Sequence, residues 1–400
     1  MSTQPVFTTN DSEPRRVASM VAALPPSGIR RFFDLVSETP GVVSLGVGEP
    51  DFVTPWHIRE AGIHALETGR TSYTPNQGMT ALRRAISKYL QEQFDVLYDP
   101  AKEIVVTVGG SEAIDLGCRA VLEPGDEAIV LQPSFVSYMP LVTLAGGVPI
   151  AVACQAANDF LPTRSAIEAV ITDKTRMLIA NFPNNPTGAA LDRATFHKIA
   201  ETVLDNDLLL MADEVYVPLS YTEDVFSFCT VPEIRNRLLL VHSFSKAWAM
   251  TGWRLGFCAG PADIIAAMTK IHQYTIMCTP IVAQLAAIEA LENGLEETLA
   301  MRREYDRRRR YITHSLNEMG LPTVEPTGAF YVFPDIRGTG FSSEAFAMRL
   351  LEEERVAVVP GPAFGECGEG HVRCSYASSM QTLQEAMKRM KNFVERHKKD

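Results

Sequence analysis

The sequence predicts an α/β protein in which a mostly parallel sheet, sandwiched by helices, forms a large domain and a smaller α+β domain follows it. The chain has 400 residues and is 46% hydrophobic, which is enough to bury a large core in two domains. Short apolar runs alternate with helix-length segments through its middle, and this pattern changes towards the end of the chain. Runs that are apolar on both faces and alternate with helices are typical of a parallel sheet covered on each side.

Six apolar runs in the middle of the chain are predicted to be the buried strands of the large domain. They cover residues 104–108, 127–131, 149–153, 176–180, 208–211 and 238–241. Segments of helix length, such as 111–122 and 192–205, lie between several of them. This alternation predicts parallel rather than antiparallel neighbours.

The last part of the chain has a different pattern. One long amphipathic helix is predicted over 295–319, ended by Gly320 and Pro322. The strands and the last helix predicted after it cover residues 329–333, 356–359, 371–376 and 380–397. The sequence therefore predicts three parts: residues 1–50 as a segment that packs with the small domain, 51–292 as the large domain, and 293–400 as the linking helix and the small domain.

Composition excludes several classes of function. A net charge of -11 argues against nucleic acid as a partner. The seven cysteines are scattered and never form a CxxC pair, so that neither a zinc site nor a disulfide framework is expected. No signal peptide and no membrane-spanning window are predicted. We expect a soluble cytoplasmic protein without membrane partners.

Two reactive side chains follow neighbouring strands of the predicted sheet. Strand 208–211 leads into Asp213, and strand 238–241 leads into Lys246. The carboxyl ends of parallel strands are where open α/β sheets bind ligands, although Asp213 alone could be a helix cap and Lys246 alone a surface lysine. Together they fit pyridoxal phosphate, which needs a lysine amine for a Schiff base and an anion beside its pyridinium nitrogen. Tyr216 is placed to reach the phenolic oxygen of the cofactor ring.

The phosphate of this cofactor needs N–H donors and positive charge. Gly110, Ser111 and Glu112 open a helix after strand 104–108, so that their backbone N–H groups make an anion site, with a plain turn as the alternative. Hydroxyl groups and a charged guanidinium fork are offered by Ser243, Ser245 and Arg254.

Two more residues beyond strand ends are predicted to contact the ring. Asn185, in an Asn-Pro-Thr-Gly run, is placed to donate to the same phenolic oxygen as Tyr216, although the run can also be only a turn. Phe135 is predicted to stack on the ring, with a core aromatic as the alternative. His242 and His272 have no partners at metal-ligand spacing, so they are predicted to pack and no metal site is expected.

Seven motifs, in this order, resemble those of the fold-type I aminotransferases of class I/II over nearly the whole chain. They are Gly48-Glu49-Pro50-Asp51-Phe52, Ser72-Tyr73-Thr74-Pro75-Asn76, Gly110-Ser111, Asn185-Pro186-Thr187-Gly188, Asp213-Glu214-Val215-Tyr216, Ser243–Lys246 with Gly252-Trp253-Arg254, and Val372-Arg373. The resemblance implies a fold-type I enzyme that depends on pyridoxal phosphate.

The resemblance also implies roles that the residues alone do not indicate. Arg373 matches the arginine that binds the substrate α-carboxylate, whereas by itself it would be a structural ion-pair partner. Gly48 matches a glycine whose backbone N–H helps to bind that carboxylate, with Gly46 as the alternative. Tyr73 matches a tyrosine that reaches the phosphate in the neighbouring subunit, which implies a homodimer with shared active sites. Phe135 stands where some relatives have tryptophan and keeps a stacking face.

The activity implied is a ping-pong transfer of an amino group from an L-amino acid to a 2-oxo acid such as 2-oxoglutarate. Lys246, displaced by the substrate, is expected to act as the general base. Aromatic or broad donor specificity is favoured, because no second arginine for a distal carboxylate is apparent. The alternatives are an aspartate or N-acetyl-diaminopimelate aminotransferase, a carbon–sulfur lyase that uses the same cofactor, and a non-catalytic regulatory protein.

Overall fold

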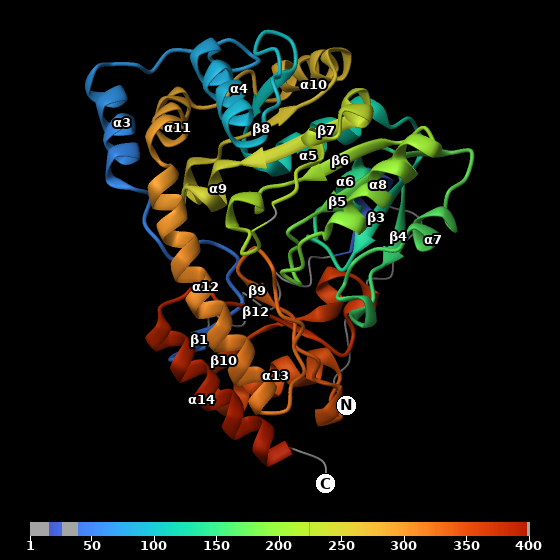
Figure 1. Cartoon of the computed structure of the whole chain (residues 1–400), viewed down its shortest axis with the longest axis vertical. Helices are drawn as coiled ribbons and strands as arrows, with labels where there is room; N and C mark the ends of the chain where they lie inside the picture. The colour runs from blue at the N-terminus through green and yellow to red at the C-terminus, as the bar shows by residue number, and fades with distance from the viewer. Residues whose placement is uncertain (1–15, 26–38, 224, 398–400) are drawn as a thin grey trace.

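A computed structural model describes residues 16–25, 39–223 and 225–397 of the chain. The predicted α/β fold is confirmed: seven strands form one twisted sheet in the order β2-β8-β7-β6-β5-β3-β4 (Figure 1). In that order they are β2 (Ile104–Thr107), β8 (Gly256–Ala259), β7 (Leu238–Ser243), β6 (Leu209–Asp213), β5 (Thr175–Asn181), β3 (Glu127–Gln132) and β4 (Val148–Ala153).

The sheet is mostly parallel, as predicted. Strands β7, β6, β5, β3 and β4 are parallel to one another, and β8 is antiparallel to both β2 and β7. Between β7 and β8 lies only the one-turn helix α9 (Phe244–Ala247) and a short 3₁₀ turn. A parallel crossover usually contains a longer helix, so the short connection favours the reversed strand.

Helices cover both faces of the sheet. Those of the large domain are α3 (Trp56–Glu67), α4 (Thr80–Phe94), α5 (Gly109–Val121), α6 (Tyr138–Leu144), α7 (Arg164–Glu168), α8 (Arg193–Asp205), α10 (Ala262–Thr275) and α11 (Ile281–Asn293). The helices predicted over 111–122 and 192–205 correspond to α5 and α8. Asp192 accepts a hydrogen bond from the backbone N–H of Thr195 and so caps α8.

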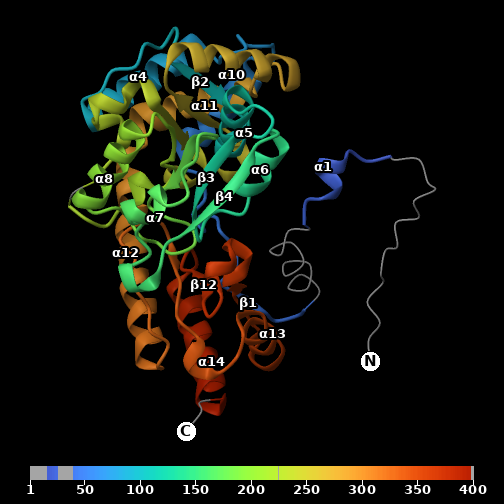
Figure 2. The ribbon, with the colours of Figure 1, turned by 90° about the vertical axis from the view of Figure 1, so that its right-hand side faces the viewer.

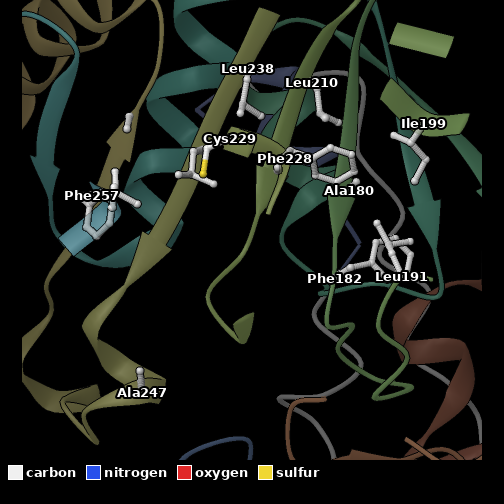
Figure 3. Packing of buried hydrophobic residues seen from close by; sticks show 14 of the residues in the cluster. Ala180, Phe182, Leu191, Ile199, Leu210, Phe228, Cys229, Leu238, Ala247 and Phe257 are labelled. Atoms are coloured by element: carbon white, nitrogen blue, oxygen red, sulfur yellow. The ribbon is translucent and has the colours of Figure 1, made fainter. Parts of the chain in front are cut away.

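Adjacent residues of a buried strand point to opposite faces, and each face has its own core. On β7, Leu238 and Leu240 pack with side chains of α4, α8 and α11, whereas Leu239 and Val241 pack with side chains of α5, α6 and α10. Figure 3 shows part of the first core, where Leu238 and Leu210 project from neighbouring strands. Burying a leucine stabilises the fold by about 1.5–3 kcal/mol, so strands that are apolar on both faces gain from both helical layers.

The small domain lies beyond the carboxyl ends of the parallel strands. Helix α12 (Leu295–Glu318) runs from the sheet domain along the small domain (Figure 1), as the sequence predicts. The other elements are β1 (Val43–Ser44), β9 (Tyr331–Val332), α13 (Ser343–Glu354), β10 (Val356–Ala357), β11 (Val359–Pro360), β12 (Val372–Ser375) and α14 (Met380–His397). Figure 2 shows α13, α14 and β12 together below the sheet.

The N-terminal segment contributes to this small domain. Strand β1 pairs in parallel with β10, while β11, β12 and β9 form a three-stranded antiparallel sheet. The single strand predicted over 356–359 is therefore two short strands in different sheets. A short helix, α1 (Ser19–Ala22), has no buried residue. Residues 1–15 and 26–38 of the predicted N-terminal segment lie outside the described residues, and the domain boundaries at 50 and 292 stay a prediction.

Candidate functional site

A cavity of about 750 Å³ lies where the carboxyl ends of β5, β6 and β7 face the small domain. The N-terminus of α5, the segment around Gly48, and strands β9 and β12 close its other sides. Of the fourteen residues predicted for the site, twelve line this cavity: Gly48, Gly110, Ser111, Phe135, Asn185, Asp213, Tyr216, Ser243, Ser245, Lys246, Arg254 and Arg373. The structure thus brings them together, and their individual roles remain predictions.

Asp213 ends β6 and is buried at the floor of the cavity. One carboxylate oxygen accepts a hydrogen bond of 2.5 Å from the hydroxyl of Tyr138, and the other accepts one from the backbone N–H of Val215 at 3.3 Å. Burial raises the pKa of Asp213 to about 6, and these two donors oppose the rise. Asp213 can therefore be anionic at neutral pH in an apolar surrounding, as an ion-pair partner for a ring cation would need to be.

Lys246 lies in α9, just beyond the end of β7. Burial, with Arg373 nearby, lowers the pKa of its amine to about 8. The amine donates a hydrogen bond of 2.6 Å to the carbonyl oxygen of Gly48. A lysine with this pKa is partly neutral near pH 7.5, which makes it a nucleophile and a base.

Backbone N–H groups, two hydroxyls and a guanidinium surround one end of the cavity. Gly110 and Ser111 lie at the N-terminus of α5, where free N–H groups and the helix dipole favour an anion. The preceding Gly109 has φ +75°, and a Cβ there would lie 2.7 Å from Nη2 of Arg254. Only glycine therefore lets the guanidinium reach this helix terminus.

The seryl hydroxyls complete this end. Oγ of Ser243 donates to Oγ of Ser245 at 2.9 Å, and Nη1 of Arg254 donates to the carbonyl oxygen of Thr251 at 3.0 Å. Ser111 and Arg254 are exposed, so this end of the cavity opens at the molecular surface. The donor set suits a phosphate group.

Arg373, on β12, faces the opposite end of the cavity. Its Nη1 donates to Oδ1 of Asn185 at 2.9 Å, and its Nη2 donates to the carbonyl oxygen of Gly46 at 2.6 Å. Its Nε is buried without a hydrogen-bond partner. A buried guanidinium with an unused donor is suited to a carboxylate, which accepts two parallel hydrogen bonds.

Asn185 is placed by the strand that precedes it. Its backbone N–H donates to Oδ1 of Asn181, the last residue of β5, at 3.0 Å. The side chain of Asn181 in turn donates to the carbonyl oxygen of Asp213 at 2.9 Å. The loop after β5 is thus held against the end of β6.

Two predicted residues do not line the cavity. The carboxylate of Glu112 turns back along α5, where it accepts hydrogen bonds from the backbone N–H of Val108 and, at 2.7 Å, from Nδ1 of His272. An acceptor in the first turn caps free N–H groups of its own helix, so this side chain is not turned towards the cavity, and the contact predicted through the backbone N–H of Glu112 stays a prediction. Tyr73 is 80% exposed and lies outside the cavity of its own chain.

Two tyrosines that line the cavity were not predicted. Tyr138 donates to Asp213, and the hydroxyl of Tyr331 lies 2.9 Å from that of Tyr216. Both tyrosines stand in apolar runs, where a core position is the usual interpretation. Their hydroxyls indicate a polar partner in the core, but the sequence does not say which one.

Membrane-spanning helices and metal-binding clusters are both absent from the described residues. No helix among them is long and apolar enough to cross a membrane. In the same part of the chain, no group of three or more His, Cys, Asp or Glu side chains is arranged to hold a metal ion.

Comparison with known proteins gives one consistent result. Residues 40–390 match the family described as aminotransferase class I and II. A putative aminotransferase of Bacillus subtilis, YugH, is 50% identical over 94% of this chain and 98% of its own. An aspartate aminotransferase of Pyrococcus abyssi is 46% identical over 93% of this chain and 97% of its own. The solved aromatic aminotransferase of Pyrococcus horikoshii superposes with a TM-score of 0.88 at 45% identity, over 92% of this chain and 99% of that structure.

Proposed function

The chain belongs to the class I and II aminotransferases, and we propose that it uses pyridoxal phosphate to move an amino group from an L-amino acid to a 2-oxo acid such as 2-oxoglutarate. One observation carries this proposal. The amine of Lys246 and the buried carboxylate of Asp213 lie at the ends of neighbouring strands and line one cavity. The same cavity has an anion site at one end and Arg373 at the other.

The residues present fit this cofactor. Asp213 supplies a buried anion for the pyridinium nitrogen, and Gly110, Ser111, Ser243, Ser245 and Arg254 supply donors for the phosphate. Phe135 offers a ring face on the cavity wall. When bound, the cofactor supplies an electron sink that stabilises negative charge at the substrate Cα.

The protein's own side chains orient the substrate and transfer or hold protons. Arg373 and Asn185 orient the substrate through its α-carboxylate, because the unused Nε of Arg373 adds a donor to the guanidinium fork. Lys246 takes the Cα proton and returns it, since an amine with a pKa of about 8 can do either near neutral pH. Asp213 holds a proton at the pyridinium nitrogen, and Tyr216 holds one at the phenolic oxygen.

The donor that we favour has an aromatic or otherwise uncharged side chain, with broad specificity. Among the described residues that line the cavity, the cations are Lys246, Arg254 and Arg373. We assign each of them to the reaction, the cofactor phosphate or the substrate α-carboxylate, so none of these three is left to bind a second carboxylate on the donor. The aromatic aminotransferase of Pyrococcus horikoshii supports this choice. The similarity to an aspartate aminotransferase supports a second candidate, an acidic donor such as aspartate, and a relative of Bacillus subtilis called a probable N-acetyl-LL-diaminopimelate aminotransferase supports a third, at 40% identity.

A spectroscopic half-reaction tests the proposal. The visible absorption band of the protein with bound cofactor is followed while single amino acids are added without any 2-oxo acid, and Lys246→Ala is measured in parallel. We expect loss of the band with stoichiometric release of one 2-oxo acid in the wild type and no reaction in the variant. The fastest donor identifies the substrate class. Continuous release of pyruvate and ammonia would instead identify a lyase, and failure to bind pyridoxal phosphate would overturn the proposal.

A further inference from the structure

Tyr331 joins the two ends of the cavity. It lies on β9, is fully buried, and lines the cavity. Its hydroxyl is 2.9 Å from the hydroxyl of Tyr216, and its ring centroid is 4.7 Å from the guanidinium carbon of Arg373. One side chain therefore touches a residue proposed to act on the cofactor ring and the residue proposed to bind the substrate carboxylate.

The two tyrosines share a hydrogen bond in which either hydroxyl can be the donor. The hydroxyl of Tyr331 has one proton and two acceptors within reach, the hydroxyl oxygen of Tyr216 at 2.9 Å and the carbonyl oxygen of Gly48 at 3.3 Å. When it donates to Tyr216, the proton of Tyr216 stays available for the phenolic oxygen of the bound cofactor. Burial raises the pKa of both phenols, and both stay protonated at neutral pH. The rings meet edge to face, with centroids 5.8 Å apart. These contacts limit the orientations that the hydroxyl of Tyr216 can adopt.

The ring of Tyr331 has a separate effect on Arg373. A guanidinium over an aromatic face is attracted to it, and this contact restricts the plane of the fork. The Cβ that a substitution at Gly48 would introduce would lie 2.7 Å from the hydroxyl of Tyr331. Tyr331, Arg373 and the backbone at Gly48 thus pack closely at the end of the cavity where a carboxylate would bind.

We propose that Tyr331 is a positioning residue with two separable actions, an inference that rests on the proposed transamination. Its hydroxyl orients Tyr216 at the cofactor ring, and its ring orients Arg373 at the substrate carboxylate. Removing the hydroxyl alone should therefore affect the chemical step, whereas removing the ring as well should also weaken carboxylate binding.

Two substitutions separate these actions. In Tyr331→Phe we expect kcat to fall by about 10-fold, with KM for the amino donor changed by less than about 2-fold, because the hydroxyl's bonds to Tyr216 and Gly48 are lost while the ring beside Arg373 stays. The pH midpoint of the cofactor's visible band should move by more than about 0.3 unit, since we propose that Tyr216 binds the phenolic oxygen of the cofactor ring. In Tyr331→Leu, KM should also rise by about 10-fold.

The chain contains a matched control. Tyr376 is also buried, and its hydroxyl lies 3.3 Å from that of Tyr221 and 3.2 Å from the carbonyl oxygen of Ala329, outside the cavity. Tyr376→Phe thus removes a similar pair of hydrogen bonds from the same domain. We expect it to leave kcat, KM and the pH midpoint unchanged. If Tyr331→Phe behaves like Tyr376→Phe in all three, the proposal is wrong.

One readout does not depend on turnover. Binding of 3-phenylpropionate, a carboxylate without an amino group, is measured by calorimetry for the wild type and the three variants. Affinity should be kept in Tyr331→Phe and fall by about 10-fold in Tyr331→Leu; equal affinity in both would overturn the action on Arg373. If the wild type bound the cofactor but transaminated no amino acid, the proposed function would be wrong. The affinities of Tyr331→Phe and Tyr331→Leu for 3-phenylpropionate would still show whether the ring of Tyr331 orients Arg373. If Tyr331→Leu did not fold, the pH midpoint of Tyr331→Phe would decide alone.

Discussion

At the scale of single residues, the chemistry of the cavity depends on side chains that are costly to bury. A buried carboxylate needs hydrogen bonds to remain anionic, and Tyr138 provides the shorter of the two bonds that Asp213 accepts. Asp213 and Lys246 could be predicted from the sequence because each is a reactive residue at a strand end within a motif. Tyr138 and Tyr331 could not, because an aromatic residue in an apolar run reveals its hydrogen-bond partner only after the chain has folded.

The pH dependence of stability should report the bond between Tyr138 and Asp213. In the cofactor-free protein, burial raises the pKa of Asp213 from 3.8 to about 6, so the folded chain keeps a proton that the unfolded chain releases. Stability therefore falls as pH rises from about 4 to about 6 and then levels off. Tyr138→Phe removes a donor that lowers this pKa, so the fall should extend to higher pH.

We expect Tyr138→Phe to lower the free energy of unfolding by about 1–2 kcal/mol near pH 7.5 and by less near pH 4.5, where Asp213 is protonated in the folded state. Urea unfolding at the two pH values measures this difference. Tyr305→Phe is the control, because the buried hydroxyl of Tyr305 has no hydrogen-bond partner. An equal loss at both pH values in Tyr138→Phe would show that the hydroxyl does not stabilise the carboxylate.

At the scale of elements, the apolar runs located six of the seven strands of the large sheet, but not β8 and not the division of 356–359 into two strands. All six strands predicted for the large domain occur within one or two residues of their predicted bounds. The antiparallel direction of β8 depends on its packing between β2 and β7, and the division of 356–359 into β10 and β11 depends on two different partners. Neither depends on local sequence alone, since strand partners are distant in the chain.

One glycine, Gly188, fixes the position of the loop after β5. Gly188 has φ +74°, and a Cβ there would lie 2.4 Å from Cβ of Pro326 and 2.5 Å from the carbonyl oxygen of Tyr331. Its own carbonyl accepts from the backbone N–H groups of Thr327 and Gly328, both at 2.9 Å. This close approach fixes the loop that contains Asn185 against the small domain.

Gly188→Ala should therefore destabilise the protein by about 2–4 kcal/mol, through both the backbone conformation and the overlap with Pro326. Thermal unfolding measures the loss. Gly338→Ala is the control, because a Cβ at Gly338 would have open space and the residue is not left-handed. A melting temperature of Gly188→Ala equal to that of the control would mean that the loop adapts without cost.

At the scale of the whole molecule, the anion end of the cavity opens at the surface next to exposed apolar side chains. Ser111 and Arg254 are exposed there, and a second hollow, lined by Val53, Trp253 and Arg254 among others, adjoins the cavity. Val53 and Trp56 are 72% and 58% exposed. Exposed apolar side chains next to a binding site are a common property of subunit interfaces. This arrangement supports the homodimer that the resemblance implies, and we propose that Tyr73 of each subunit serves the cavity of the other.

A hybrid dimer tests this sharing. Lys246→Ala lacks the essential amine, and Tyr73→Ala lacks the tyrosine that we propose each subunit donates to its partner, so both pure variants should be impaired. Co-expressed with different affinity tags, they should form hybrid dimers. In a hybrid, the subunit that retains Lys246 receives Tyr73 from its partner, so one of the two sites is intact. Purified hybrids should have about half of the wild-type activity, because a two-fold dimer has two equivalent sites.

The alternative arrangement gives a different result. If Tyr73 served the cavity of its own chain, each site in the hybrid would carry one defect, and activity would equal the mean of the two pure variants. If the protein were a monomer, sedimentation would show no dimer, and no hybrid would be recovered through the second tag. Because Tyr73 is 80% exposed and lies outside its own cavity, we expect the hybrid to recover activity.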